Sequence, residues 1–384
     1  MTVTKQLPPV KIYFENLNAI RFIAALLVII FHTEKFKLFL NVPDYSGNRV
    51  VSIIGSLGVV LFFVLSGFLI SFLLFKEQEI TKTISIKDFY IRRILRIWPL
   101  YFLIVILALF IIPFINFFTI TGFERNIVYD NLIYKLLLYV FFLPNMVLAL
   151  FAFIPYASQL WSIGAEEQFY LVWPFLNKKI NNKWLLLSGV IFIYLIIKFY
   201  VPFFIPSGVY RDVFVQFWES MPIDCMAIGG LFALIIYETS PFTLFIRKIL
   251  FNKLFQWIIL ILTVSLIYLG IHFPYFQYEV YSVLFGILIC NFAANKNRIF
   301  SMENSTTNFL GKISYGLYMF HPIAIVFSIK LLRKFHLLSN YILYPVILIL
   351  VIVMSALSYE FFEKKFLNKK LKYSKLISGD SVKD

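Results

Sequence analysis

Arg21 and His32 lie in the first long apolar segment of this chain, residues 17–36, where ionisable side chains are costly. Eleven helical steps of about 100° bring both side chains to one face, about 16 Å apart along the axis. An Arg at the centre of a membrane helix costs about 2.5–3.5 kcal/mol on insertion scales, and such groups usually line a substrate or proton path. The pair predicts either intramembrane chemistry or a polar contact that ties this helix to its neighbours.

Two adjacent carboxylates, Glu166 and Glu167, follow Trp161 at the start of another apolar segment, residues 161–176. If this segment runs opposite to the first, helical rise places Glu167 at about the depth of His32 in a core of roughly 30 Å. A carboxylate at that depth can orient an imidazole and compensate its charge, which favours an acid–base pair. The alternative is a salt bridge or polar cluster at the interface.

Two further groups of residues predict a cavity with an anion-binding end. Arg93 and Arg96 precede the third apolar segment and share a helix face. Guanidinium groups suit phosphate because they stay charged and offer several donors in a fixed geometry, although arginine here is also the ordinary topogenic signal. A second intramembrane histidine, His321, follows Tyr315 and Tyr318, which predict either a substrate cavity or a satisfied polar seam.

Composition indicates an all-α, polytopic membrane protein. Apolar residues make up 61% of the 384 residues and charged residues 14%. Runs of about 20 apolar residues can cross roughly 30 Å of hydrocarbon, and without strand alternation they are predicted to be helices. Small residues in the second run, Gly55, Gly58, Ser66 and Gly67, predict close helix packing. We predict about ten spans, at residues 17–36, 51–75, 97–118, 161–176, 184–203, 222–239, 254–272, 278–294, 309–330 and 341–362.

The distribution of basic residues predicts that both termini are cytoplasmic. In that orientation 23 of the 35 Lys and Arg residues lie in inside segments and 7 in outside segments, as the positive-inside rule requires. The net charge of +15 therefore reflects topology, and no nucleic-acid partner is expected. A single membrane domain is predicted at 17–362, between a cytoplasmic tail (1–16) and a basic cytoplasmic tail (363–384).

Two features complete the predicted architecture. Residues 132–152 are apolar enough to span, but a span there would move the lysines at 178, 179 and 183 outside. Since Pro144 and Asn145 interrupt a clean helix, we predict a re-entrant or interfacial segment. Cys225 and Cys290 fall inside predicted spans as packing residues, and two thiols form neither a disulfide framework nor a metal-ligand cluster, so no metal is expected.

Five motifs in a fixed order resemble the integral-membrane acyltransferase 3 family, which includes O-acetyltransferases of bacterial surface polysaccharides. Their order over nearly the whole chain is more specific than any one of them. They are Arg-x10-His (21–32), GxxGVxxFFxLSGFLI (55–70), RRxxRIxP (92–99), WSIxxEEQFYLxxP (161–174) and ISYGLYxFHP (313–322).

The resemblance implies a ten-helix enzyme of the bacterial inner (cytoplasmic) membrane. It would move an acyl group from cytoplasmic acetyl-CoA, or another acyl-CoA, to a hydroxyl of a cell-surface glycan or lipid-linked sugar. Arg21 and His32 match the family's Arg-x10-His pair, and Arg93 and Arg96 match its RxxR pair, which suits CoA phosphates. This sequence lacks the Arg that many relatives place before the residue equivalent to Asp224, and the soluble domain fused to some members, so transfer would finish in the membrane part or on a separate partner.

The expected mechanism assigns catalysis to His32, oriented by one of the two adjacent carboxylates. Neutral His32 would remove the proton of the acceptor hydroxyl, and a covalent acyl-His32 intermediate is the variant. The RxxR pair would bind the CoA phosphates while Arg21 contacts the donor deeper in the cavity. The other candidates for the substrate cavity are His321, Tyr315, Tyr318, Ser66 and Trp161.

Three other functions remain open from the sequence. The same chemistry would serve acylation of a secreted small molecule. A transporter or flippase would use the same intramembrane charges, but inverted repeats and paired broken helices are not evident. A membrane scaffold without chemistry leaves the buried charges unexplained. The sequence does not determine the acceptor, the acyl length or the oligomeric state.

Overall fold

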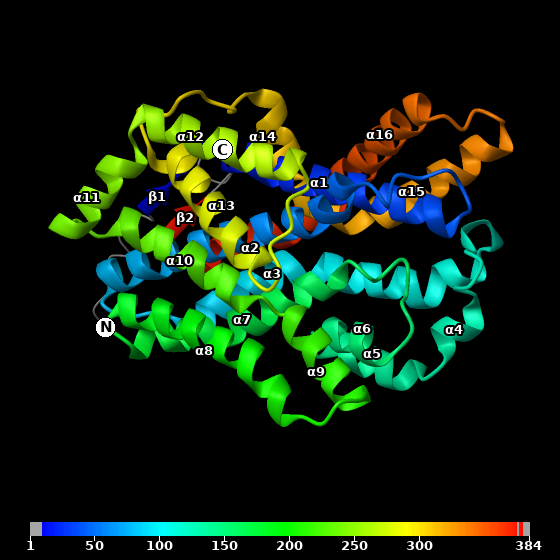
Figure 1. Ribbon diagram of the computed structural model, residues 1–384, viewed down its shortest axis with the longest axis horizontal. Helices are drawn as coiled ribbons and strands as arrows, with labels where there is room; N and C mark the ends of the chain where they lie inside the picture. Colours follow the sequence, from blue (N-terminus) through cyan, green and yellow to red (C-terminus); the bar gives the residue numbers. More distant parts are fainter. Residues whose placement is uncertain (1–9, 375, 379–384) are drawn as a thin grey trace, which may run out of the picture.

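A computed structural model describes residues 10–374 and 376–378, which form a bundle of mostly long α-helices (Figure 1). Ten of the described helices have 15 or more residues, and each overlaps one of the ten predicted spans. They are α1 (Leu17–Phe39), α2 (Arg49–Thr81), α3 (Ile86–Ile106), α7 (Leu160–Lys179), α8 (Lys183–Phe204), α10 (Ile223–Tyr237), α12 (Lys253–Tyr268), α13 (Gln277–Ala294), α15 (Ser314–Lys334) and α16 (Asn340–Ser358).

Shorter elements connect these helices. The short helices are α4 (Arg125–Tyr129), α5 (Leu132–Val140), α6 (Pro144–Leu150), α9 (Val209–Glu219), α11 (Pro241–Leu250), α14 (Ser305–Lys312) and α17 (Lys364–Lys370). A π-turn at Leu107–Ile111 continues α3, and a second π-turn at Tyr359–Glu363 joins α16 to α17. Single 3-10 turns lie at Ile112–Phe114, Asn116–Phe118 and Leu371–Tyr373. Two short strands, β1 (Val10–Ile12) and β2 (Leu376–Ser378), pair in parallel.

The membrane-protein prediction is confirmed by the length and apolar character of the helices. Within the described residues, eight helical segments are long and apolar enough to cross a membrane, or nine if the pair α11 and α12, bent by 65°, counts as one span. The predicted span at 161–176 is present as α7, a 20-residue helix, but its glutamates, glutamine and terminal lysines make it less apolar than the others. The orientation of the termini stays a prediction.

The segment 132–152 is interrupted as the sequence predicts. It forms α5 and α6, separated by residues 141–143, and Pro144 stands in the first turn of α6, where its missing N–H costs no helical hydrogen bond. Asn145 and Gln168 of α7 exchange side-chain hydrogen bonds of 3.0 and 3.3 Å. These bonds hold the broken segment against α7.

The core lies where α1, α2, α10, α13 and α15 pack together. In the most apolar windows of α2 and α15, 78% of the residues are buried, against 17% in α8. The outer helix α8 instead exposes large apolar side chains, such as Phe203 at 81% and Phe204 at 83%. An apolar exterior of this kind is the surface expected to face lipid.

Small residues bring the central backbones into direct contact, which confirms the packing prediction. A Cβ placed on Gly58 would lie 2.7 Å from the carbonyl oxygen of Ala24, and one on Gly67 would lie 1.9 Å from that of Met226. On the facing helix, a Cβ on Gly229 would lie 2.1 Å from the carbonyl oxygen of Val64. The helices α2 and α10 are therefore in contact through glycines contributed by both.

Gly67→Ala is expected to destabilise the bundle by about 1–3 kcal/mol, because α2 and α10 must move apart to admit the new methyl group. Thermal unfolding of the detergent-purified protein measures the effect as a lower Tm. Gly189→Ala in α8 is the matched control, since a Cβ there meets nothing within 4 Å and alanine favours helix. An unchanged Tm for Gly67→Ala would contradict the close packing.

A buried ion pair that the sequence analysis did not identify fixes the far end of α1. Lys37 Nζ lies 2.9 Å from Glu34 Oε1, with side chains 0% and 1% exposed. Glu34 also accepts hydrogen bonds from the backbone N–H of Tyr45 and from the hydroxyl of Tyr344, while Lys37 donates to Asn340 Oδ1 at 3.1 Å. The pair thus ties the α1 segment that carries His32 to the following loop and to α16.

Lys37→Met is expected to destabilise the fold by about 3–5 kcal/mol, because it leaves the Glu34 carboxylate buried without its cation. The double variant Glu34→Gln with Lys37→Met should recover part of this loss. Both effects are measured as shifts in Tm. As the control, Lys76→Met breaks a partly exposed pair with Glu79 and should change stability by about 0–1 kcal/mol. Equal Tm values for Lys37→Met and Lys76→Met would refute the argument.

Candidate active site

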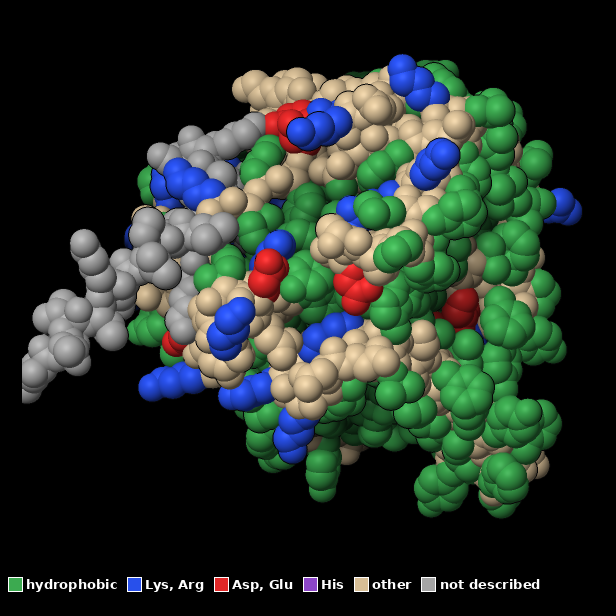
Figure 2. Space-filling model, turned by 90° about the vertical axis from the view of Figure 1, so that its left-hand side faces the viewer, with side chains coloured by type: hydrophobic (Ala, Val, Ile, Leu, Met, Phe, Trp, Pro, Cys, Tyr) green, Lys and Arg blue, Asp and Glu red, His purple; other side chains and the backbone are tan. Residues whose placement is uncertain are grey.

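A cavity of about 410 Å³ lies among α1, α2, α3, α7, α15 and the C-terminal segment. Ile12 of β1 and Leu371 line one end of it, so the cavity reaches the end of the bundle at which β1 and β2 pair (Figure 1). Figure 2 views this end and shows many Lys and Arg side chains gathered over it. Seven of the predicted site residues line the cavity: Arg21, Ser66, Arg93, Arg96, Glu166, Tyr315 and Tyr318.

Arginines from two helices form the basic part of the cavity. Arg93 is half-buried, with its guanidinium 5.8 Å from the ring centroids of Phe89 and Tyr170. Its buried Nε has no hydrogen-bond partner among the described residues. Arg96 is exposed, and Arg21 of α1 donates to Asn18 Oδ1 at 2.9 Å. Stacked and exposed guanidinium groups of this kind present N–H donors to an anion in the cavity.

Hydroxyl groups and one carboxylate line the part of the cavity deeper in the bundle. The Tyr170 hydroxyl donates to Glu166 Oε2 at 3.3 Å and also shares a short hydrogen bond with Ser66. The hydroxyls of Ser162 and Tyr318 lie 2.6 Å apart. Because hydroxyl groups both donate and accept, this wall can bind polar groups of a substrate.

The two intramembrane histidines lie side by side, next to the cavity and not in its lining. The ring centroids of His32 and His321 are 4.8 Å apart, and that of Tyr318, a cavity residue, is 5.7 Å from His321. The carbonyls of Val28 and Tyr318 lie 3.0 and 2.6 Å from Nδ1 of His32 and His321 respectively. A carbonyl only accepts, so in each neutral ring Nδ1 carries the proton and Nε2 has the free lone pair.

The exposure of the two residues differs. His321 is fully buried, and its Nε2 has no hydrogen-bond partner in the described part of the chain. His32 is partly exposed. Of the two, His32 is therefore the more accessible residue.

The predicted pairing of His32 with Glu166 or Glu167 does not form. Glu167 Oε2 accepts a hydrogen bond from Trp98 Nε1 at 3.0 Å, and the partner of Glu166 is Tyr170. The depth argument fixed height in the membrane, but not the direction of each side chain around its helix. Glu167 contacts Trp98 of α3 and Glu166 bonds within α7, whereas His32 lies against His321 of α15.

Trp161, Tyr315 and the two cysteines have contacts that join or pack helices. Trp161 packs edge-on against Phe63 of α2, with ring centroids 6.1 Å apart, and does not line the cavity. The Tyr315 hydroxyl donates to the carbonyl of Ile97 at 2.9 Å and so joins α15 to α3. Cys225 and Cys290 are both buried. Among the described residues, no group of three or more His, Cys, Asp or Glu is placed to hold a metal ion.

More charged residues line the cavity than the sequence analysis named. Lys312, Glu363, Lys364 and Lys370 also line it. The last three follow the predicted membrane domain, in the segment that the sequence assigned to a tail. Their basic composition is equally typical of a cytoplasmic tail, so the sequence alone did not distinguish a tail from a segment that lines the cavity.

Comparison with known protein families gives a match over most of the chain. The family described as "Acyltransferase domain" matches residues 14–360. A Staphylococcus aureus (strain COL) protein, provisionally named an O-acetyltransferase, is 34% identical over 42% of this chain and 24% of its own length. The peptidoglycan O-acetyltransferase OatA of Listeria monocytogenes is 26% identical over 80% of this chain and 49% of its own length.

A third relative and the solved structures complete the comparison. A Bacillus subtilis (strain 168) protein, provisionally named a peptidoglycan O-acetyltransferase, is 25% identical over 92% of this chain and 54% of its own length. This chain therefore spans about half or less of the length of these relatives. No solved structure matches it.

Proposed function

Because this chain belongs to the acyltransferase 3 family, we propose that it is a multi-pass membrane O-acyltransferase that transfers an acetyl group from acetyl-CoA to a hydroxyl of a cell-envelope glycan. The observation that carries the proposal is the cavity, which has a basic end and a hydroxyl-lined end beside two histidines. A polyanionic donor with a long neutral arm fits these two chemistries. The names of two relatives favour peptidoglycan as the acceptor.

The proposed donor pose places the phosphates of CoA against Arg93 and Arg96. The pantetheine arm would extend past Arg21 along α1 toward Tyr318, in the direction of His32. On helical geometry the separation of Arg21 and His32 is about 16 Å along the axis. Such a pose brings a thioester from the basic end toward the histidines without moving a helix.

The proposed chemistry is direct transfer with His32 as the general base. The acceptor oxygen attacks the thioester carbonyl while His32 Nε2 takes the hydroxyl proton. Collapse of the tetrahedral intermediate breaks the carbon–sulfur bond and releases the CoA thiolate, which takes up a proton to leave as the thiol. The hydrogen bond from Nδ1 to Val28 orients the ring for this role. Attack by His32 itself, giving an acetyl-His32 intermediate, is the variant.

The test is CoA release from acetyl-CoA by the detergent-purified protein, with and without peptidoglycan fragments. Release that depends on the acceptor, together with an acetyl mass on the fragments, supports the proposal. Mass spectrometry of cell-surface glycans from cells with and without the gene identifies the natural acceptor. No CoA release, combined with movement of a solute across proteoliposomes, would contradict it and favour a transporter.

A further inference from the structure

The chain beyond α16 is folded over the basic end of the cavity. The π-turn at Tyr359–Glu363 leads into α17, which packs on α3. Five residues of α17 and the turn after it line the cavity, namely Lys364, Leu367, Asn368, Lys370 and Leu371. We call residues 364–374 the C-terminal wall, because they close one side of the cavity next to the RxxR arginines.

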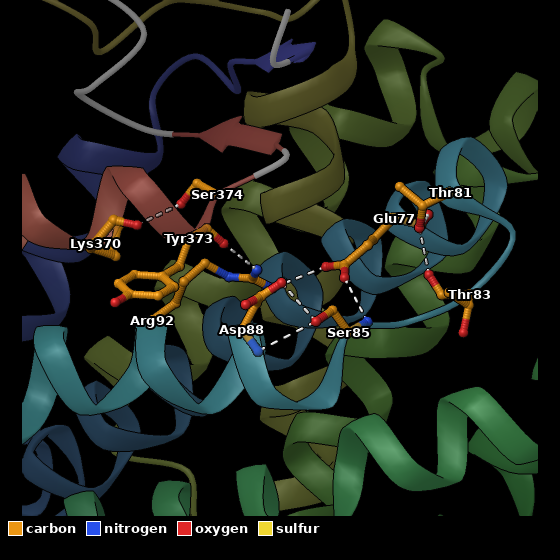
Figure 3. A network of polar contacts seen from close by, with 9 residues as sticks. All are labelled: Glu77, Thr81, Thr83, Ser85, Asp88, Arg92, Lys370, Tyr373 and Ser374. Carbon is orange, nitrogen blue, oxygen red and sulfur yellow. Dashed lines mark hydrogen bonds and ion pairs between the residues drawn. The ribbon is translucent and has the colours of Figure 1, made fainter. Parts of the chain in front are cut away.

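A polar network fixes the C-terminal wall to α3 (Figure 3). Arg92 donates to the carbonyl of Tyr373 at 2.9 Å and to Glu77 Oε2 at 3.0 Å, and the Glu77 side chain is 4% exposed. The other oxygen of Glu77 accepts from the backbone N–H of Ser85, the residue that caps α3. Arg92 is thereby committed to a structural contact and does not line the cavity.

The electrostatics of the C-terminal wall indicate an anion. The charges that act most strongly on the Lys370 ammonium are the guanidinium groups of Arg96, Arg93, Arg92 and Arg21, and all are repulsive. Among the residues that the structure describes, six cations and two carboxylates line the cavity. Like charges at short range in a poorly solvated site destabilise one another. A ligand with several phosphate groups would turn this repulsion into attraction.

We infer that Lys370 binds a phosphate group of the donor, so that the C-terminal wall is part of the donor site. The inference rests on the proposed function for the identity of the polyanion as CoA. Lys370 is the last residue of α17, which packs on α3, and it is half-buried and lines the same cavity as Arg93 and Arg96. Its ammonium is a compact charge on a flexible stem, whereas each guanidinium offers donors in a fixed planar geometry. The Ser374 hydroxyl donates its proton to the Lys370 carbonyl at 3.1 Å, so that proton is used within the C-terminal wall.

The matched pair of variants is Lys370→Ala and Lys369→Ala in the full chain. Lys369 is exposed on the same helix and does not line the cavity. In calorimetric titration with CoA, Lys370→Ala is expected to weaken binding by about 10- to 150-fold, as for loss of a charge-assisted contact, while Lys369→Ala binds as the wild type does. Removing a repelled cation should leave Tm unchanged or higher, which separates lost binding from lost folding.

The Arg92→Gln variant tests the attachment of the C-terminal wall. It should weaken CoA binding although Arg92 does not line the cavity, and it should speed proteolytic cleavage after residue 370. Bound CoA should slow that cleavage in the wild type. Unchanged binding and unchanged cleavage in Arg92→Gln would overturn the claim that this network holds the wall in place.

The outcomes separate this inference from the proposed function. If the wild type binds CoA and Lys370→Ala binds it equally well, the inference is wrong and the proposed function stands. If the wild type does not bind CoA, the proposed donor is wrong, and titration of the same variants with inorganic pyrophosphate decides the inference. A loss confined to Lys370→Ala then supports it, whereas equal binding, or none by the wild type, overturns it.

Discussion

His32→Ala is expected to lower acetyl transfer to a glycan hydroxyl by about 10²- to 10⁴-fold, the usual contribution of a general base. The affinity for CoA should not change, because His32 does not line the cavity that holds the basic residues. The hydrogen bond between Nδ1 and the carbonyl of Val28 leaves Nε2 as the only basic nitrogen of the neutral ring. Initial rates with acetyl-CoA and a soluble peptidoglycan fragment measure the loss.

His272→Ala is the control for this variant, since His272 is exposed and lies outside the cavity lining. Wild-type rates from purified His32→Ala protein would exclude His32 both as base and as nucleophile. The two roles are separated by mixing wild-type protein with acetyl-CoA and no acceptor. A stoichiometric acetyl group on a peptide containing His32 indicates the covalent variant, and its absence during steady turnover indicates direct transfer.

The helices could be predicted because the membrane imposes their length. A core of roughly 30 Å requires about 20 apolar residues in each helix, and the ten predicted spans each overlap a long helix. The same logic explains why Gly58 and Gly67 could be assigned to packing, since a missing Cβ allows backbones to approach. Pro144 and Asn145 likewise marked the break between α5 and α6.

The partners of the site residues could not be predicted, because they depend on how each helix is rotated and tilted. Helical rise gave the heights of His32 and Glu167 but not the faces on which their partners lie, so His321 was not recognised as the neighbour of His32. The C-terminal wall was missed for another reason. In the sequence, the lysines within 364–372 are typical of a cytoplasmic tail. In the structure, the π-turn after α16 directs this segment onto α3.

Replacing Arg93 and Arg96 together with alanine is expected to weaken CoA binding more than any other change in the cavity. Each charge-assisted hydrogen bond contributes about 1.5–3 kcal/mol, so each single variant should lose about 10- to 150-fold in affinity. The double variant should lose less than the product of the two, because neighbouring residues that share a ligand are not additive. Calorimetric titration with CoA measures all three values.

The geometry of the two arginines predicts unequal losses of CoA affinity in the two single variants. The Arg93 guanidinium lies 5.8 Å from the ring centroids of Phe89 and Tyr170, and its buried Nε has no hydrogen-bond partner in the described part of the chain. These contacts restrict its side chain before an anion binds, whereas Arg96 is exposed and must lose side-chain freedom on binding. We therefore expect Arg93→Ala to be the more damaging single variant and Arg93→Lys to rescue it poorly. Lys87→Ala, which removes an exposed cation from the same helix, is the control for net charge. CoA affinity unchanged in the double variant would remove the donor role from both arginines.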